Sequence, residues 1–325
     1  MRRVLLLGAG GPAANGVARC LNLPSYHLHG ANPSADDLEH APVDERHQLW
    51  VNSHDHSQLA DEELLDLITK IRPDVVHAQP DEEVARVSRL RNEIRDLGCR
   101  VFLPRKEVVA LCQDKWCTYR ALEPWVPVPC SGLMHDIYKL GTDRIHVRPT
   151  TGAGGKGSFS GSPSAVLQFT TTVERRVVEY MCAEWLPGPT VTWQALYANG
   201  ELVCSQLRRR LAWTNVDRGS CRIGETFTDQ RTNDIAKDAV FQIDLFPHGI
   251  YGVDMTLDAD GQPRVTEINI GRFFTTIEFF TQLGLNFPEL YVRTAMGEDV
   301  SADKINEGWM WLRSMDAKPK LLKCA

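Results

Sequence analysis

The sequence predicts an α/β fold in which an N-terminal Rossmann-like domain precedes a mixed α+β region. Three observations predict it. Apolar segments of strand length alternate with amphipathic segments of helix length over the first hundred residues. A polar, glycine-rich segment with one lysine, residues 150–158, follows a segment with strand character. Residues 251–269 have the pattern of a β-hairpin that carries acidic side chains. The 325 residues leave room for about two domains of ~100–200 residues each.

The first hundred residues favour a doubly wound parallel sheet. Val4–Leu7 is a continuous apolar run, which is typical of a parallel strand buried on both faces. Strands and helices then alternate as βαβ units require. The other predicted strands are Tyr26–His29, Asp74–Ala78 and Arg100–Leu103, and the predicted helices are the stretch ending at Leu21, Asp61–Lys70 and Glu82–Leu97.

A glycine-rich turn, Gly8–Gly16, follows the first predicted strand. Its backbone N–H groups could hold an anion at the helix N-terminus; the alternative is a tight packing turn between strand and helix. Pro12 and Ala13 depart from the GxGxxG fingerprint. Residues 31–33 are Ala-Asn-Pro, where a dinucleotide-binding domain would place an acidic residue. We therefore do not expect NAD binding.

The composition excludes several classes of protein. Hydrophobic residues make up 43% of the chain and charged residues 24%, as in ordinary soluble globular proteins. The net charge of −6 argues against a nucleic-acid or anionic-membrane binder. We expect no membrane span and no signal peptide, because every apolar run is short. Nine cysteines without metal-binding spacing favour free thiols in a reducing cytoplasm.

Two polar clusters of the first part each allow a functional and a structural interpretation. The His-Asp-His of residues 54–56 is compatible with a metal site, but its polar surroundings favour a solvated loop. The acidic residues Asp81, Glu82 and Glu83 fit the first turn of a helix. Their alternative role is contact with a substrate at the strand end.

The middle of the chain predicts a phosphate-binding region. Apolar residues at helical spacing cover 105–122, with a second helix expected to begin near Asp114-Lys115. Prolines at 124, 127 and 129 mark a linker. Ile145–Pro149 is a predicted strand that delivers Arg148.

The glycine-rich segment, Thr150–Ser158, comes directly after that strand. Its four glycines and one lysine suit a flap whose amides and ammonium group close over a polyphosphate. It is not a Walker A loop, because the four-residue gap before Gly-Lys-Ser/Thr is missing. The alternative is a mobile Gly/Ser hairpin.

The segment Glu184–Pro189 breaks two predicted strands with Pro-Gly-Pro. Exposed backbone groups there could bind an adenine edge, with Trp185 and Leu186 as an apolar wall. The predicted strand Val191–Tyr197, a turn at residues 199–200 and the strand Glu201–Leu207 follow.

The hairpin at residues 251–269 brings hard oxygen donors together. Asp-Gly at 260–261 favours the turn. Glu267 and Asn269 lie two apart on one strand and share a face, and folding can bring Asp254 alongside them. Two carboxylates and an amide oxygen suit Mg²⁺ that bridges substrate phosphates. The alternative is an amphipathic surface hairpin with solvated acids.

The substrate pocket has weaker signals. Arginines suit bidentate contact with a carboxylate, although the triplet Arg208–Arg210 also fits an exposed charge run at a strand end. Gly219–Arg222 and Gly271–Thr276 flank the acidic strands or follow them. We expect four phenylalanines to belong to the core, namely Phe273, Phe274, Phe279 and Phe280.

In their order along the chain, these motifs resemble the ATP-grasp superfamily, and the likeness is closest to the carbamoyl-phosphate-synthetase-like branch and to D-alanine–D-alanine ligase. The motifs are Asp-Lys at 114–115, Val-Arg-Pro before the glycine-rich segment, Glu-Trp-Leu-Pro-Gly-Pro, and Asp254 followed by Glu267-Ile-Asn269. The resemblance covers nearly the whole chain. It implies a Rossmann-like pre-ATP-grasp domain at 1–104, a small ATP-grasp subdomain with the lid at 105–175, and a C-terminal ATP-grasp subdomain with the Mg²⁺ site at 176–325, the two subdomains clasping the nucleotide.

The resemblance also implies ATP and two Mg²⁺ ions as cofactors, with Mn²⁺ as an alternative metal. Asp254, Glu267 and Asn269 would be the metal ligands. Lys115 and Arg148 would hold the α- and β-phosphates, and the backbones of Glu184 and Leu186 would bind adenine. The full nucleotide-binding set implied by position is Lys115, Arg148, Gly152, Gly154, Gly155, Lys156, Gly157, Ser158, Glu184, Trp185, Leu186 and Thr190.

Three departures from the family pattern affect the site. Thr190 stands where the family often has a glutamate for the ribose hydroxyls. Residues 252–253 are Gly-Val where the ligases have an arginine before the first metal ligand. The arginine after Asn269 is displaced to Arg272. Stabilisation of the transferring phosphoryl group would therefore fall to Arg272 or to the arginine triplet. The resulting catalytic candidates are Arg272, Arg210 and Lys156, and the substrate-binding candidates are Arg208, Arg210, Gly219, Ser220 and Arg272.

The implied function is an ATP-dependent carboxylate–amine ligase that forms an acyl phosphate, makes an amide bond, and releases ADP and phosphate. An amino acid or small carboxylate and an amine are the expected small-molecule partners, and a homodimer is compatible with the sequence. No motif demands a covalent enzyme intermediate. The alternatives are a carbamate- or acyl-phosphate-forming kinase and a non-catalytic ATP-binding regulatory protein.

Overall fold

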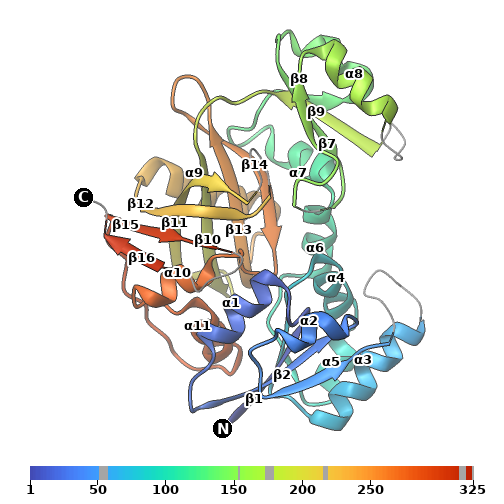
Figure 1. Cartoon of the computed structure of the whole chain (residues 1–325), viewed down its shortest axis with the longest axis vertical. Coiled ribbons are helices and arrows are strands. Elements are labelled where there is room, and N and C mark those ends of the chain that lie inside the picture. Colours follow the sequence, from blue (N-terminus) through green and yellow to red (C-terminus); the bar gives the residue numbers. More distant parts are fainter. Residues whose placement is uncertain (51–57, 153, 173–178, 215–218, 315–319, 324–325) are drawn as a thin grey trace.

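The computed structural model describes the whole chain except residues 51–57, 153, 173–178, 215–218, 315–319 and 324–325. The His-Asp-His of 54–56 therefore lies outside the described residues. The described strands form three sheets, which stand at the bottom, the top and the left of Figure 1. Among the described helices none is long and apolar enough to cross a membrane.

The N-terminal domain has a parallel sheet in the order β3-β2-β1-β4-β5, as the alternation of strands and helices predicts. Its central strand β1 is buried over Val4–Leu7. The strands are β1 Arg2–Leu7, β2 Tyr26–Asn32, β3 Glu45–Gln48, β4 Val75–Ala78 and β5 Arg100–Val101; the helices are α1 Pro12–Cys20, α2 Ala35–Glu39, α3 Gln58–Ile71, α4 Asp81–Arg89 and α5 Arg91–Asp96.

Two features of this domain differ from expectation. Strand β3, with the sequence Glu-Arg-His-Gln, was not predicted, because an exposed edge strand has no apolar alternation to reveal it. The helix expected over 82–97 is two helices that meet at Leu90, whose φ of −87° and ψ of 15° leave the helical region.

The glycine-rich turn after β1 is built for close packing. A Cβ on Gly8 would lie 2.4 Å from the ring of Pro80, and a Cβ on Gly10 would lie 1.9 Å from the carbonyl oxygen of Asp37. Both glycines also have φ in the left-handed region, at 76° and 92°. The packing interpretation of this turn therefore accounts for Gly8 and Gly10.

The small sheet has the order β6-β9-β7-β8 and is antiparallel. Its final strand β9 pairs with β7, so the expected boundary between residues 175 and 176 would separate β9 from its own sheet. The cause is the chain path: the linker that leaves this sheet comes after β9. The elements are β6 Ser131–Leu133, the 3₁₀ helix η1 Met134–Leu140, β7 Ile145–Pro149, β8 Phe159–Gly161, α8 Pro163–Thr172 and β9 Tyr180–Glu184.

The large sheet has the order β14-β13-β10-β11-β12-β15-β16. The turn between β13 and β14 is held by Asp258, whose carboxylate accepts hydrogen bonds from the backbone N–H groups of Asp260 and Gln262. The elements are β10 Thr190–Ala198, β11 Glu201–Trp213, β12 Cys221–Phe227, α9 Gln230–Ile243, β13 Gly249–Leu257, β14 Pro263–Ile270, β15 Trp309–Leu312 and β16 Lys320–Lys323.

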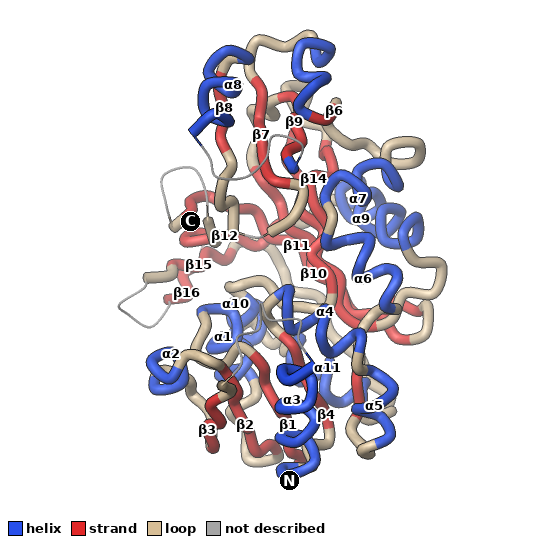
Figure 2. The backbone as a smooth tube through the Cα atoms, turned by 90° about the vertical axis from the view of Figure 1, so that its right-hand side faces the viewer, coloured by secondary structure: helices blue, strands red, loops and turns tan. Residues whose placement is uncertain are grey.

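One face of the large sheet is covered by helices α9, α6 (Lys106–Gln113) and α7 (Lys115–Leu122), as Figure 2 shows. Asp114 caps α7 by accepting a hydrogen bond from the Cys117 N–H, which confirms the expected helix start. Both α6 and α7 pack on β14. The helical part of the expected small subdomain therefore belongs with the large sheet, whose apolar face it buries.

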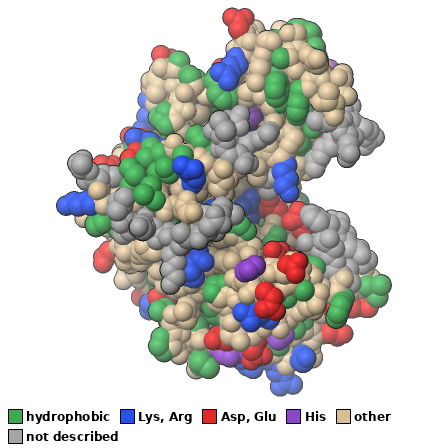
Figure 3. Space-filling model, viewed as in Figure 1, with side chains coloured by type: hydrophobic (Ala, Val, Ile, Leu, Met, Phe, Trp, Pro, Cys, Tyr) green, Lys and Arg blue, Asp and Glu red, His purple; other side chains and the backbone are tan. Residues whose placement is uncertain are grey.

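The C-terminal helices α10 (Ile277–Gln282) and α11 (Phe287–Ala295) pack against α1 of the N-terminal domain. Phe273, Phe279 and Phe280 are buried there, as expected. Phe274 differs, because it is only partly buried and lines a cavity. The small-sheet lobe stands apart from the N-terminal domain, and the surface between the two is hollowed (Figure 3).

Candidate active site

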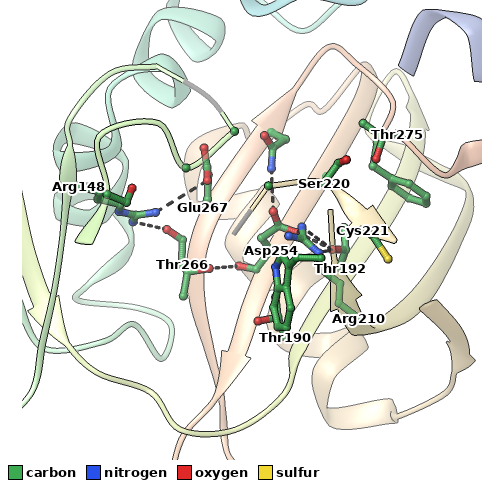
Figure 4. Close-up of a pocket in the computed structure, with 18 of the residues that line it drawn as sticks. Arg148, Thr190, Thr192, Arg210, Ser220, Cys221, Asp254, Thr266, Glu267 and Thr275 are labelled. Atoms are coloured by element: carbon green, nitrogen blue, oxygen red, sulfur yellow. Dashed lines mark hydrogen bonds and ion pairs between the residues drawn. The ribbon is translucent and has the colours of Figure 1, made fainter. Parts of the chain in front are cut away.

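A cavity of about 310 Å³ lies between the small sheet and the face of the large sheet opposite to α6, α7 and α9. Figure 4 shows side chains from β7, β10, β11, β13 and β14 converging on it. Strand alternation explains its polar floor: on β10 the polar Thr190, Thr192 and Gln194 line the cavity, while Val191 and Trp193 between them join the buried core.

The register of the sheet places the expected oxygen donors side by side. Asp254 on β13 lies opposite Glu267 on β14, and Gly252 lies opposite Asn269. Asp254 is also opposite Thr192 on β10, which in turn is opposite Arg208 on β11. One row across four strands therefore presents acidic, hydroxyl and guanidinium groups to the cavity.

Asp254 is held by three neighbours. Its carboxylate accepts hydrogen bonds from Thr192 Oγ1 at 2.5 Å, Arg210 Nη2 at 2.7 Å and Asn269 Nδ2 at 3.2 Å. Burial alone would raise the pKa of Asp254, but the Arg210 charge and the Thr192 hydrogen bond outweigh it, so the pKa lies below the usual value. Asp254 is therefore ionised at neutral pH.

Glu267 faces two cations from different parts of the chain. Its carboxylate lies 3.3 Å from Lys115 Nζ and 3.8 Å from Arg148 Nη1. Arg148 Nη2 also donates to the Thr266 carbonyl at 2.6 Å (Figure 4). Burial lowers the pKa of Arg148, and Glu267 partly offsets this effect. These contacts connect β14 with α7 and β7 across the cavity.

The glycine-rich segment borders the cavity beside Lys115. The Lys115 ammonium group donates to the carbonyl oxygen of Gly152. Four glycines of this segment have φ between 68° and 103°, in the left-handed region that other residues rarely adopt: Gly152, Gly154, Gly155 and Gly157. The exposed Lys156 and the partly buried Ser158 line the cavity, whereas Gly157 is not among its lining residues and packs towards Pro149 and Tyr180.

Arg208 is a buried cation at the floor of the cavity, with 1% of its surface exposed. It donates to the hydroxyls of Thr276 and Thr192, and its guanidinium carbon lies 4.4 Å from the centre of the Phe274 ring. In the described part of the chain no carboxylate forms a salt bridge with Arg208, and its Nε has no hydrogen-bond partner. Burial lowers its pKa. The exposed charge run considered for this triplet is therefore wrong for Arg208.

Arg272 joins the cavity to the N-terminal domain. It donates to the side-chain oxygen of Asn269 and forms a salt bridge with Asp81 at the start of α4. Burial opposes the charge on Arg272, but Asp81 and Glu267 outweigh it and raise its pKa. Of the acidic residues 81–83, Asp81 is thus tied to a cavity residue.

The expected adenine-binding residues lie at the end of β9 and just after it, and they do not line the cavity. The Glu184 carboxylate accepts a hydrogen bond from the Cys130 N–H at 2.9 Å. The Arg144 guanidinium carbon lies 4.1 Å from the centre of the Trp185 ring. Leu186 follows β9 in the linker to β10 and is partly buried. Their role with adenine stays a prediction.

The remaining substrate candidates, Gly219 and Ser220, line the cavity beside Cys221, and Ser220 accepts a hydrogen bond from Arg313 at 3.0 Å. Sequence reasoning missed several lining residues, among them Thr192, Gln194 and Trp213. The alternation of polar and apolar residues after Thr190 could have indicated the first two. Thr275 also lines the cavity, and it belongs to Gly271–Thr276, a segment expected near the substrate pocket.

The donor chemistry at Asp254, Glu267 and Asn269 fits Mg²⁺. The group offers two carboxylates and an amide on adjacent strands, and hard oxygen donors are what this ion prefers. Its carboxylates are neutralised here by Lys115, Arg148 and Arg210, so the same atoms that would contact a metal now contact cations.

Comparison with solved structures supports the fold. The chain resembles N5-carboxyaminoimidazole synthetase from Staphylococcus aureus in complex with ADP, with a TM-score of 0.75, 16% identity, and coverage of 96% of this chain and 82% of that one. It resembles the biotin carboxylase domain of Hydrogenobacter thermophilus 2-oxoglutarate carboxylase, with a TM-score of 0.71, 15% identity, and coverage of 95% of this chain and 73% of that one. It also resembles L-amino acid ligase from Bacillus licheniformis, with a TM-score of 0.70, 12% identity, and coverage of 96% of this chain and 79% of that one. These identities are low, so the likeness shows the fold alone.

Sequence comparison gives the family. No curated protein matches the chain. A family model described as an ATP-grasp domain matches residues 112–276, half of the chain, and this range runs from the end of α6 through the glycine-rich segment and β10–β14 to Thr276. The expected resemblance is therefore confirmed, and the chain belongs to the ATP-grasp family.

Proposed function

We propose that this protein is an ATP-dependent carboxylate–amine ligase. A substrate carboxylate oxygen attacks the γ-phosphorus of ATP, which gives an acyl phosphate and ADP. An amine then attacks the acyl carbon, the bond to the phosphate oxygen breaks, and the amide forms with release of phosphate and a proton. The observation that carries the proposal is the row Glu267, Asp254, Thr192 and Arg208 across the cavity floor.

The nucleotide would lie between the two sheets. Arg148 comes from β7 and Lys115 from the start of α7, both lie close to Glu267, and their charges suit the α- and β-phosphates. Lys156 borders the cavity from the glycine-rich segment, so it can approach the terminal phosphate when that segment closes. Closure would also exclude water from the acyl phosphate, which water would hydrolyse.

Asp254, Glu267 and Asn269 would hold the Mg²⁺ ions. When bound, the ions supply positive charge that neutralises the phosphate oxygens during transfer. Arg210 and Arg272, each beside one of these ligands, supply further positive charge where the phosphoryl group moves.

The substrate carboxylate would bind at Arg208. A buried guanidinium without an acidic partner is costly to the folded state, and an anionic ligand at this position would remove that cost. Thr192 and Thr276 orient Arg208, while Phe274 covers its face. Only Thr192 on β10 separates Arg208 from Asp254 in the row across the sheet, so the carboxylate that Arg208 binds would lie close to the proposed site of phosphoryl transfer.

The names of the similar solved structures support the proposed ligase function. One was crystallised with ADP and another with MgADP and bicarbonate, and a third is an amino acid ligase by its name. The intact pair of carboxylates at 254 and 267 argues against a purely regulatory ATP-binding protein, because such a protein does not need to stabilise phosphoryl transfer.

The test is a screen of amino acids and small carboxylates, singly and in pairs with amines, with Mg-ATP and phosphate release as the readout. A ligase releases phosphate with a carboxylate and an amine together and little without the amine. Full turnover without amine would instead indicate an acyl-phosphate- or carbamate-forming kinase. If no pair gives turnover although Mg-ATP raises the melting temperature, the regulatory alternative is favoured. Sedimentation equilibrium tests separately whether the chain forms the homodimer with which its sequence is compatible.

A further inference from the structure

A group of histidines on the edge of the N-terminal sheet, remote in sequence from the cavity residues, has the chemistry of a metal site. His27 and His29 lie two apart on β2 and therefore share a face. On the neighbouring strand β3, Glu45 is opposite His29 and His47 is opposite Ala31. Three imidazoles and one carboxylate therefore lie on the same face of strands β2 and β3.

The contacts within this group bring the ligating atoms together. His29 Nδ1 lies 3.0 Å from His47 Nε2, and His27 Nε2 lies 2.9 Å from a Glu45 carboxylate oxygen. One ligand atom from each of His27, His29 and Glu45 falls within 4.8 Å of the others. A tetrahedral zinc site with bonds of about 2.0–2.1 Å places its ligand atoms about 3.3 Å apart. His47 is outside the 4.8 Å set and contacts the group through His29, so its ring and the exposed Glu45 side chain would have to turn to share one ion.

The neighbouring groups indicate which ring nitrogens face the metal-binding group. His27 Nδ1 faces the Asp44 carboxylate at 3.7 Å, and that carboxylate also accepts a hydrogen bond from the Leu28 N–H at 2.7 Å. A carboxylate behind a histidine is the usual arrangement that orients a metal-binding imidazole. His29 is 4% exposed and its Nε2 is buried with no partner among the described residues, so Nδ1 is the nitrogen that faces the group. Burial lowers the pKa of His29 and of His47, which favours neutral imidazole, the form that binds metals.

We propose that His27, His29, His47 and Glu45 bind one Zn²⁺ or a similar divalent transition-metal ion. Imidazole nitrogens with a carboxylate suit zinc and disfavour Mg²⁺, which prefers oxygen ligands only. The ion would tie the exposed edge strand β3 to β2. This site does not depend on the proposed ligase function, and no residue of the cavity takes part in it.

The test uses the untagged full-length protein, stripped with a chelator and kept in saturating Mg²⁺ so that the oxygen donors at Asp254 are occupied. Zn²⁺ affinity is measured by competition with a chromophoric chelator, and Co²⁺ reports tetrahedral nitrogen coordination through its visible absorption. We expect one ion per chain, and at least about 10-fold weaker binding in His29→Asn and in His47→Asn. The exposed Glu45→Gln variant guards against misfolding and should also weaken binding.

The matched control is His40→Asn, which changes an exposed histidine of the same domain outside the group and should bind zinc like the wild type. Anomalous scattering at the zinc edge gives the position directly. The proposal is overturned if no ion binds, if the three variants and His40→Asn bind zinc equally well, or if the anomalous peak lies elsewhere. Each of these readouts is independent of ligase activity, so this proposal and the proposed function can fail separately.

Discussion

Replacement of Arg208 by methionine should separate folding stability from function. The side chain is 1% exposed and has no carboxylate partner in the described structure. The substitution removes hydrogen bonds to two threonine hydroxyls, each worth ~1.5–3 kcal/mol for a charged donor, and a cation–π contact of ~0.5–2 kcal/mol. It also removes a buried charge whose desolvation costs several kcal/mol. The lost hydrogen bonds and cation–π contact nearly cancel the desolvation cost that is removed. We therefore expect the free energy of unfolding to fall by no more than about 1 kcal/mol, or to rise.

Substrate binding should respond differently. Loss of one partner of a buried charge pair costs ~2–5 kcal/mol, so the KM for the carboxylate substrate should rise at least about 30-fold at ~1.4 kcal/mol for each factor of ten. The KM for ATP should change little, because Arg208 lies on β11, away from Lys115 and Arg148.

The assays are urea unfolding followed by tryptophan fluorescence and coupled detection of ADP. The matched control is Arg209→Met: Arg209 is the next residue on β11 and pairs with the partly exposed Glu225, so neither quantity should change strongly. A loss of more than 3 kcal/mol of stability in Arg208→Met, together with an unchanged KM for the carboxylate, would refute this reasoning.

Three further predictions concern the metal ligands, the lid and pH. Glu267→Gln should lower kcat about 100-fold and shrink the rise in melting temperature that Mg-ATP causes in the wild type; equal values in both proteins would remove Glu267 from the site. Lys156→Ala should lower kcat more than it weakens ATP binding measured by calorimetry, because the lysine borders the cavity from the glycine-rich segment; the opposite pattern would count against a lid role. Burial lowers the pKa of His77 to about 4, against a hydrogen bond to Gln79 that raises it, and the ring is 1% exposed. The unfolded chain then takes up a proton near pH 6.5 and the folded chain only near 4, so stability is fully present above pH 6.5 and falls as pH drops through that window, by about 3 kcal/mol. Urea unfolding across this range should show that extra loss in the wild type and in His40→Leu but not in His77→Leu; an identical slope in all three proteins would contradict it.

The local sequence pattern was sufficient to predict those elements whose signals lie within a few residues of one another. The Asp114 cap, the Asp-Gly turn and the alternation on β13 and β14 all depend on short-range backbone chemistry, and each element occurs where it was expected. The buried run Val4–Leu7 likewise follows from its position at the centre of a parallel sheet.

Contacts between distant segments could not be predicted in this way. The salt bridge of Arg272 with Asp81 joins residues 191 positions apart, and nothing local to either residue indicates it. The burial of Arg208 depends on Thr276 and Phe274, which reach it from beyond β14. The polar strand β3 gave no periodicity, because its side chains are largely exposed.

A crystal structure with Mg²⁺ and a non-hydrolysable ATP analogue tests the central claim most directly. We expect metal ions bound to Asp254, Glu267 and Asn269, with the triphosphate beside Lys115 and Arg148. Metal ions and triphosphate bound away from the β13–β14 hairpin would contradict the account.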